Sequence, residues 1–128
     1  MLQNNTKSKE WVLKAQNDLK SAEILFQENG PSDSICFHCH QVAEKMLKGF
    51  LIFNKKEFPK VHDLIYLLNL CEKTDKNFEN LKGKISFLNR YYIETRYPSD
   101  VFIYSKEECR KSLNIAQDLF KFISSKIL

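Results

Sequence analysis

Apolar residues that recur every three or four positions constrain this chain most, because that spacing places them on one face of an α-helix. The pattern runs from Thr6 to Asn29 and is interrupted by Asn29-Gly30-Pro31. Gly readily takes the left-handed conformation just past a helix end, and Pro cannot continue the hydrogen-bond ladder. The sequence therefore predicts a long first helix, a tight turn, and a second helix capped by Ser32 or Asp33.

The same spacing predicts four helices after the first. The second runs to about Asn54, a short third spans His62 to Cys71, and a fourth runs from Leu81 to near Thr95, after a loop at 74–80. The last begins at Ser105-Lys106-Glu107-Glu108, a capping box in which side chains bind exposed backbone N–H groups. Three Gly and three Pro are too few for the many turns of an all-β fold. We expect an all-α domain over residues 1–128, with four long helices in an up-down bundle plus one short helix.

Composition narrows the class of protein further. Apolar residues make up 43% and charged residues 28% of the chain, as in soluble domains, and no window approaches the roughly 18 apolar residues of a membrane span. The four cysteines lack regular spacing and no signal segment opens the chain. We therefore expect reduced thiols, a cytoplasmic location and no membrane contact.

The stretch from Cys36 to His40 gathers two cysteines and two histidines, which raises the question of a metal site. On a helix, His38 and His40 project about 160° apart and cannot share an ion. Cys36, Cys39 and His40 lie within roughly 100° of arc, but a closed zinc site needs a fourth ligand. We expect no metal, Cys39 in the core, and an exposed contact between His40 and Glu44 one turn later.

Taken together, several blocks of the sequence resemble a HEPN domain. They include CFHCHQVAEKMLKGFL at 36–51, PKVHDLIYLL at 59–68, LNRYYIETRYPSD at 88–100 and the Ser-x-Glu-Glu helix start, in that order. The resemblance covers nearly the whole chain, from about Trp11 to Ile123. It implies a helical bundle that forms homodimers and pairs with a minimal nucleotidyltransferase in a toxin–antitoxin-like system.

A second branch of that superfamily consists of metal-independent ribonucleases marked by an arginine followed, after four to six residues, by a histidine. After Arg96 the corresponding positions hold Val101, Phe102 and Ile103, and the last histidine of the chain is His62. The resemblance therefore implies a non-catalytic binding module, with no catalytic residues. The alternative is a ribonuclease that combines Arg96 with a non-standard histidine, His38 or His62.

Nucleotide binding by such a module calls for cations and stacking rings. Arg96 can grip a phosphate with two parallel N–H bonds, and other residues can add charge, polar contacts or base stacking. The candidates are Arg96, Lys45, Lys48, His38, Tyr92 and Tyr97. No cofactor is expected, because the chain has no Gly-rich phosphate loop and no Asp pair placed to hold magnesium.

Each candidate also has a purely structural interpretation. Arg96 can pair with Glu44 or Glu94 inside the protein, because a buried arginine needs a partner. The two lysines can belong to a solvated helix face, the tyrosines to the core, and His62 can cap the third helix through an exposed backbone N–H. RNA is a further candidate ligand, because the net charge of +4 permits contact with phosphates.

Overall fold

The computed structural model describes residues 2–92 and 102–128, with side chains from Thr6 onward. The described residues form five α-helices and one 3₁₀-helix and contain no strand, which confirms the all-α class. Arg96 and Tyr97, and with them Glu94, lie outside the described residues. None of the described helices is both long and apolar enough to span a bilayer.

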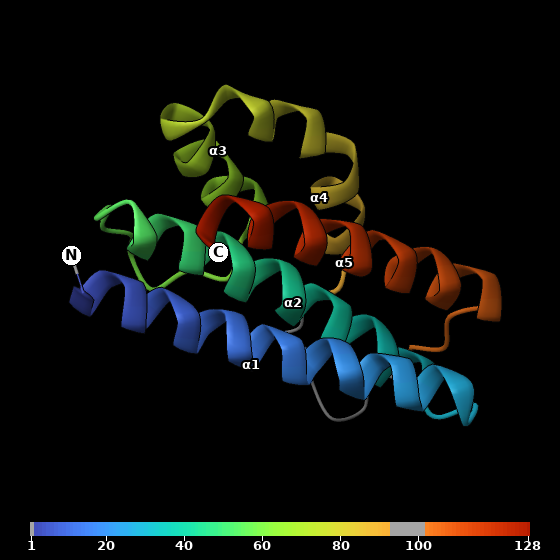
Figure 1. Cartoon of the computed structure of the whole chain (residues 1–128). Helices are drawn as coiled ribbons and strands as arrows, with labels where there is room; N and C mark the ends of the chain where they lie inside the picture. Colours follow the sequence, from blue (N-terminus) through green and yellow to red (C-terminus); the bar gives the residue numbers. More distant parts are fainter. Residues whose placement is uncertain (1, 93–101) are drawn as a thin grey trace.

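Three long helices form the body of the bundle (Figure 1). Helix α1 (Leu2–Gln27) runs antiparallel to α2 (Ser32–Phe53), and α5 (Lys106–Ile127) lies against both, parallel to α2. Their facing sides are lined by the apolar stripes that the sequence predicts, including Ala15, Ala22, Cys39 and Met46, all fully buried. The hydrophobic effect of closing these stripes on one another holds the bundle together.

The shorter elements cover α2 and α5 on the side away from α1 (Figure 1). They are α3 (Leu64–Thr74), the 3₁₀-helix η1 (Lys76–Leu81) and α4 (Lys82–Asn89). The sequence predicts a loop where η1 lies and a fourth helix nearly twice as long as α4. Helix α4 ends early because the amide of Asn89 is drawn to the start of α3, where it accepts from the Leu64 N–H and donates to Asp63.

Two helix ends differ from the sequence prediction. At the first turn it is Asn29, not Gly30, that takes the positive φ of 57°. Gly30 is favoured for a different reason, since a Cβ there would lie 2.8 Å from Cδ2 of Leu25 and 3.2 Å from its backbone oxygen, so the Leu25 side chain would have to shift. Helix α2 has no side-chain cap, because its N-cap residue is Pro31, and the hydroxyl of Ser32 accepts from the backbone N–H of Tyr104 at 2.8 Å.

At the start of α5 half of the predicted capping box is present. The Ser105 hydroxyl accepts from the Glu108 N–H at 3.1 Å, as predicted. The Glu108 carboxylate turns inward and accepts from the phenol of Tyr91 at 2.6 Å. The same phenol accepts from Ser112, so this hydrogen-bonded group joins the end of α4 to the first turns of α5.

Candidate functional site

One side of α2 carries two histidine–carboxylate pairs, which together we call the α2 polar seam. In the first pair, Nδ1 of His38 lies 2.8 Å from Oδ1 of Asp18 on α1. The other oxygen of the same carboxylate accepts from the ammonium group of Lys45. All three side chains are partly exposed, so this pair lies at the rim of the α1–α2 contact.

The second pair is centred on a buried carboxylate. Glu44 is only 4% exposed, and its Oε2 accepts from the ammonium group of Lys48 at 3.0 Å. Its two oxygens also lie 3.1 and 3.2 Å from Nδ1 of His62, which precedes α3. The side chain of His62 is 42% exposed. The carboxylate is therefore shared between a buried cation and a histidine that reaches the surface.

Lys48 is enclosed by aromatic rings as well as by Glu44. Its ammonium group lies 5.8 Å from the ring centres of both Trp11 and Phe58, and the residue is 6% exposed. A desolvated ammonium group needs a carboxylate and is also attracted to the faces of aromatic rings. This environment holds the start of α1 and the connection from α2 to α3 against the middle of α2.

In both pairs the histidine faces its carboxylate with the same ring nitrogen, Nδ1, and this fixes which nitrogen carries the hydrogen. A carboxylate can only accept, so Nδ1 of His38 and of His62 must carry the hydrogen in each pair. In a neutral ring the other nitrogen, Nε2, is then an acceptor. Each pair therefore presents an oriented imidazole nitrogen that can bind a donor or accept a proton.

His40 lies behind the second pair and is fully buried. Its Nδ1 is 3.9 Å from Oε1 of Glu44, and its Nε2 makes no hydrogen bond to a described residue, although the backbone of His62 lies close enough to favour the protonated ring. Burial lowers the pKa of His40 to about 4, against the smaller opposing effect of the Glu44 carboxylate. His40 is therefore neutral at physiological pH. The contact between His40 and Glu44 that the spacing predicts is present, but it is buried rather than exposed.

The ring of Tyr92 packs against both His62 and His40. Its ring stacks on His62 with centroids 5.4 Å apart and on His40 at 6.1 Å. It is also the last described residue before the segment that carries Arg96 and Tyr97. Tyr92 is thus a packed, half-buried member of the seam rather than an isolated ring.

The structure places the remaining candidates as follows. Lys45 and Lys48 are each bonded to a carboxylate. The structural interpretation, which places both lysines on a solvated helix face, is wrong for Lys48, because Lys48 is buried. His62 does not cap α3, because the Asp63 side chain accepts from the Ile65 N–H at 2.9 Å. Nucleotide binding by these residues stays a prediction.

Sequence reasoning overlooked the role of Asp18 and Glu44 as the carboxylates that orient the histidines. The spacing of Glu44 and Lys48, four positions apart on one helix, is a signal that could have identified half of the second pair. The contacts of Asp18 with α2 and of Glu44 with His62 join residues distant in sequence. They depend on helix packing that no local pattern encodes.

The cysteines supply no metal site. Among the described residues no group of three His, Cys, Asp or Glu side chains is placed to hold a metal ion. All four cysteines are buried and reduced, and Cys36 and Cys109 lie with their sulfur atoms 3.9 Å apart. Burial raises the pKa of Cys39 and Cys71, which keeps them as thiols that pack in the core.

Comparison with known proteins relates this arrangement to a family. A protein of Methanocaldococcus jannaschii named "Putative toxin MJ1304" is 27% identical over 130 residues, covering 91% of this chain and 85% of that protein. The crystal structure of TT1696 from Thermus thermophilus is 28% identical, with a TM-score of 0.78, covering 94% of this chain and 98% of that chain.

A second crystal structure, of ST0689, described as an archaeal HEPN homologue, superimposes with a TM-score of 0.76 over the same shares of the two chains. At 24% identity it shows the shared fold alone. The HEPN domain family matches residues 8–127, which is nearly the whole chain. The protein therefore belongs to the HEPN domain family.

Proposed function

We propose that this HEPN protein is a binding module of a toxin–antitoxin-like pair, which forms a homodimer and binds a nucleotide, a minimal nucleotidyltransferase partner, or both. The relative named as a toxin supports the toxin–antitoxin-like part. The absence of any histidine after residue 62 supports the non-catalytic part, because the ribonuclease motif requires one downstream of its arginine.

The α2 polar seam is the proposed nucleotide site. The side chains of His38 and His62 are 28% and 42% exposed, so an imidazole nitrogen of each can contact a ribose or phosphate group. Lys45, 23% exposed, adds positive charge at the rim. Lys48 acts indirectly by fixing Glu44, which in turn orients His62.

The segment after Tyr92 completes the proposal. Tyr92, the last described residue before 93–101, packs on His62. In this proposal Arg96 grips the phosphate and Tyr97 or Tyr92 stacks on the base. An Arg96→Lys variant keeps the charge but loses the paired N–H geometry, so it should bind a nucleotide more weakly.

Calorimetric titration with ATP, GTP and their monophosphates tests the nucleotide part. Binding should weaken in His62→Gln and in Arg96→Lys and stay unchanged in Lys20→Gln, an exposed residue of α1. Equilibrium sedimentation tests the homodimer, and copurification with a nucleotidyltransferase encoded beside this chain tests the partner. No nucleotide binding together with no nucleotidyltransferase in the purified complex would contradict both binding roles.

A metal-independent ribonuclease is the second candidate, and two observations favour His62 over His38 as its base. His62 is the more exposed of the two and contacts Tyr92, the last described residue before the segment that carries Arg96. An oriented imidazole can remove the proton from a ribose 2′-hydroxyl. Cleavage of mixed RNA in EDTA that disappears in both Arg96→Ala and His62→Gln would establish this candidate and exclude the non-catalytic role.

A further inference from the structure

At the end of the bundle where α4 stops and α5 starts, two cations that have no carboxylate partner among the described residues share one aromatic ring. The guanidinium carbon of Arg90 lies 4.1 Å from the ring centre of Phe87, and the ammonium group of Lys111 lies 4.4 Å from the same centre. Both cations are exposed, and neither forms a salt bridge with a described residue. One half-buried ring therefore supports two cations from different helices.

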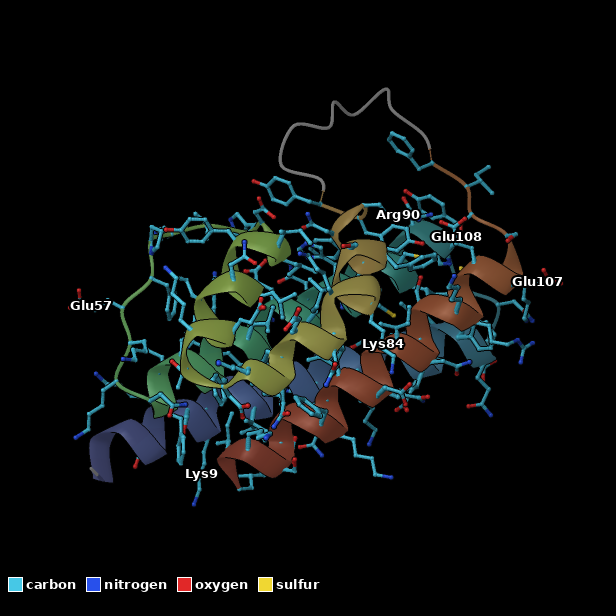
Figure 2. All side chains as sticks on the ribbon, turned by 90° about the horizontal axis from the view of Figure 1, so that it is seen from above. Lys9, Glu57, Lys84, Arg90, Glu107 and Glu108 are labelled. Atoms are coloured by element: carbon cyan, nitrogen blue, oxygen red, sulfur yellow. The ribbon has the colours of Figure 1, made fainter. Side chains whose placement is uncertain are left out.

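Two cations that share one ring repel each other, although weakly because both are exposed to water. Neither of the two nearby carboxylates forms a salt bridge with them. Glu108 is engaged by the Tyr91 phenol, and Glu107 makes no salt bridge to a described residue. Figure 2 shows Arg90, Glu107 and Glu108 at this end of the bundle, far from Lys9 and Glu57. A bound anion would relieve the repulsion.

A row of aromatic rings leads from Phe87, whose ring contacts the two cations, to an exposed apolar segment. Phe87 contacts Tyr91 at 6.0 Å, Tyr91 contacts Tyr104 at 5.1 Å, and Tyr104 stacks on Phe102 at 6.5 Å. Phe102 is 41% exposed and the neighbouring Ile103 is 85% exposed. The row is no longer than about five residues of extended chain. One short peptide is therefore long enough to contact both the two cations and the exposed apolar residues.

We propose that Arg90, Lys111, Phe102 and Ile103 form a docking surface for an acidic segment of a protein partner that also carries an aliphatic or aromatic residue. Carboxylates of that segment contact Arg90 and Lys111, and its apolar side chain covers Ile103. This goes beyond the proposed function, because it names the chemistry of a partner and does not require that partner to be a nucleotidyltransferase.

A protein segment fits this surface better than a nucleic acid does. Single-stranded nucleic acids bind where bases find free ring faces. Here Tyr91 is 1% exposed, Phe87 is covered by the two cations, and Ile103 offers no ring. Of Phe87, Tyr91 and Phe102, only Phe102 is exposed enough to receive a base, and one ring does not make a row of stacking sites. Glu107 would also repel a continuous line of phosphates, whereas carboxylates on a peptide can be spaced to avoid it.

Selection from a random peptide library displayed on phage, with the intact protein as bait, tests the inference. The peptides recovered should combine Asp or Glu with aliphatic or aromatic residues, and their binding should weaken as salt is raised. In fluorescence anisotropy with a selected peptide, Arg90→Gln and Lys111→Gln should each weaken binding about threefold, and both together about tenfold. Ile103→Ser should weaken it about tenfold.

Lys121→Gln is the matched control, because Lys121 is an exposed lysine of the same helix some 15 Å further along. It should leave peptide binding unchanged, and circular dichroism should show every variant folded. The inference is overturned if selection yields no peptide, if the peptides are not acidic, or if they bind the double variant as well as the original protein. It is also overturned if Arg90 and Lys111 prove necessary only for binding to oligouridine or to phosphatidylserine vesicles.

Discussion

Two regions of the molecule differ in whether their positive charges are paired with carboxylates. They are the α2 polar seam and the surface formed by Arg90, Lys111, Phe102 and Ile103. In the seam Lys45 and Lys48 each bond to a carboxylate, and Lys48 is buried. At the other surface Arg90 and Lys111 rest on an aromatic ring and remain exposed. The first arrangement uses its charges within the fold to orient histidines, whereas the second leaves them available to another molecule.

The difference follows from burial. A buried ammonium group loses its hydration, so a carboxylate must accompany it, and that requirement fixes the geometry around it. An exposed guanidinium keeps its water and needs no fixed partner. Changes in the seam should therefore alter stability, and changes at the α4–α5 end should alter binding.

The largest expected effect follows from Glu44→Gln. Loss of the carboxylate leaves Lys48 buried without a counter-charge, so the free energy of unfolding should fall by about 3 to 5 kcal/mol in urea denaturation. The double variant Glu44→Gln with Lys48→Met should recover most of this loss, because Met can pack between Trp11 and Phe58.

The control for that measurement is the exposed pair of Lys84 and Asp118, whose side chains are 43% and 61% exposed. Asp118→Asn should lower the free energy of unfolding by less than about 1 kcal/mol. If Glu44→Gln costs no more than this, the buried ion pair does not determine the structure of the seam.

The second effect is a dependence of stability on pH that His40 confers. The pKa of His40 is about 4 in the folded protein and 6.5 in an unperturbed side chain. Between these values the unfolded chain binds a proton that the folded chain does not, so stability falls as pH falls from 6.5 to 4. The loss amounts to about 3 kcal/mol and is absent above this range.

His40→Phe keeps an aromatic ring against Tyr92 but cannot titrate. The melting temperatures of the variant and of the original protein should be measured from about pH 4 to pH 7. The variant should lose less stability on acidification than the original protein does. Parallel curves would mean that burial of His40 does not govern the acid sensitivity. The α4–α5 end offers the comparison, because residues 82–92 and 102–113 contain no histidine.

A smaller effect should come from Tyr91→Phe, at the boundary between the two regions. The phenol of Tyr91 donates to Glu108 and accepts from Ser112 inside the protein. Its removal should lower the free energy of unfolding by about 1 to 3 kcal/mol, because Glu108 loses its donor. Thermal unfolding followed by circular dichroism measures this, and a Tyr66→Phe variant, whose tyrosine is 44% exposed, should show no change.

The smallest effect on stability should come from Arg90→Gln and Lys111→Gln. Because both cations are exposed and unpaired among the described residues, each change should alter the free energy of unfolding by less than about 0.5 kcal/mol. A loss as large as that of Glu44→Gln would show that these cations are structural and would remove the contrast between the two regions.

Much of the fold could be predicted from local patterns. The apolar spacing predicted the α-helices, and the Ser105 cap of α5 and the burial of Cys39 were predicted with them, because each depends on residues within a few positions of one another. Helix ends were less predictable where a side chain binds elsewhere in the fold. Ser32 and Asn89 are examples, since their partners Tyr104 and Leu64 are distant in sequence.

The candidate site shows the same division. Its histidines and lysines could be selected from the sequence, but their pairing with Asp18 and Glu44 could not. The burial of His40 also escaped prediction, because the angular position of His40 on α2 says nothing about the ring of Tyr92, which stacks on it.

The sequence by itself determined the helices, the membership in a family of helical bundles and the absence of a histidine downstream of the arginines. These properties depend on residue order alone. The tertiary structure decided which charges are neutralised and which face solvent, because burial and distance across helices set the energy of a charge, and neither is a local property of the chain.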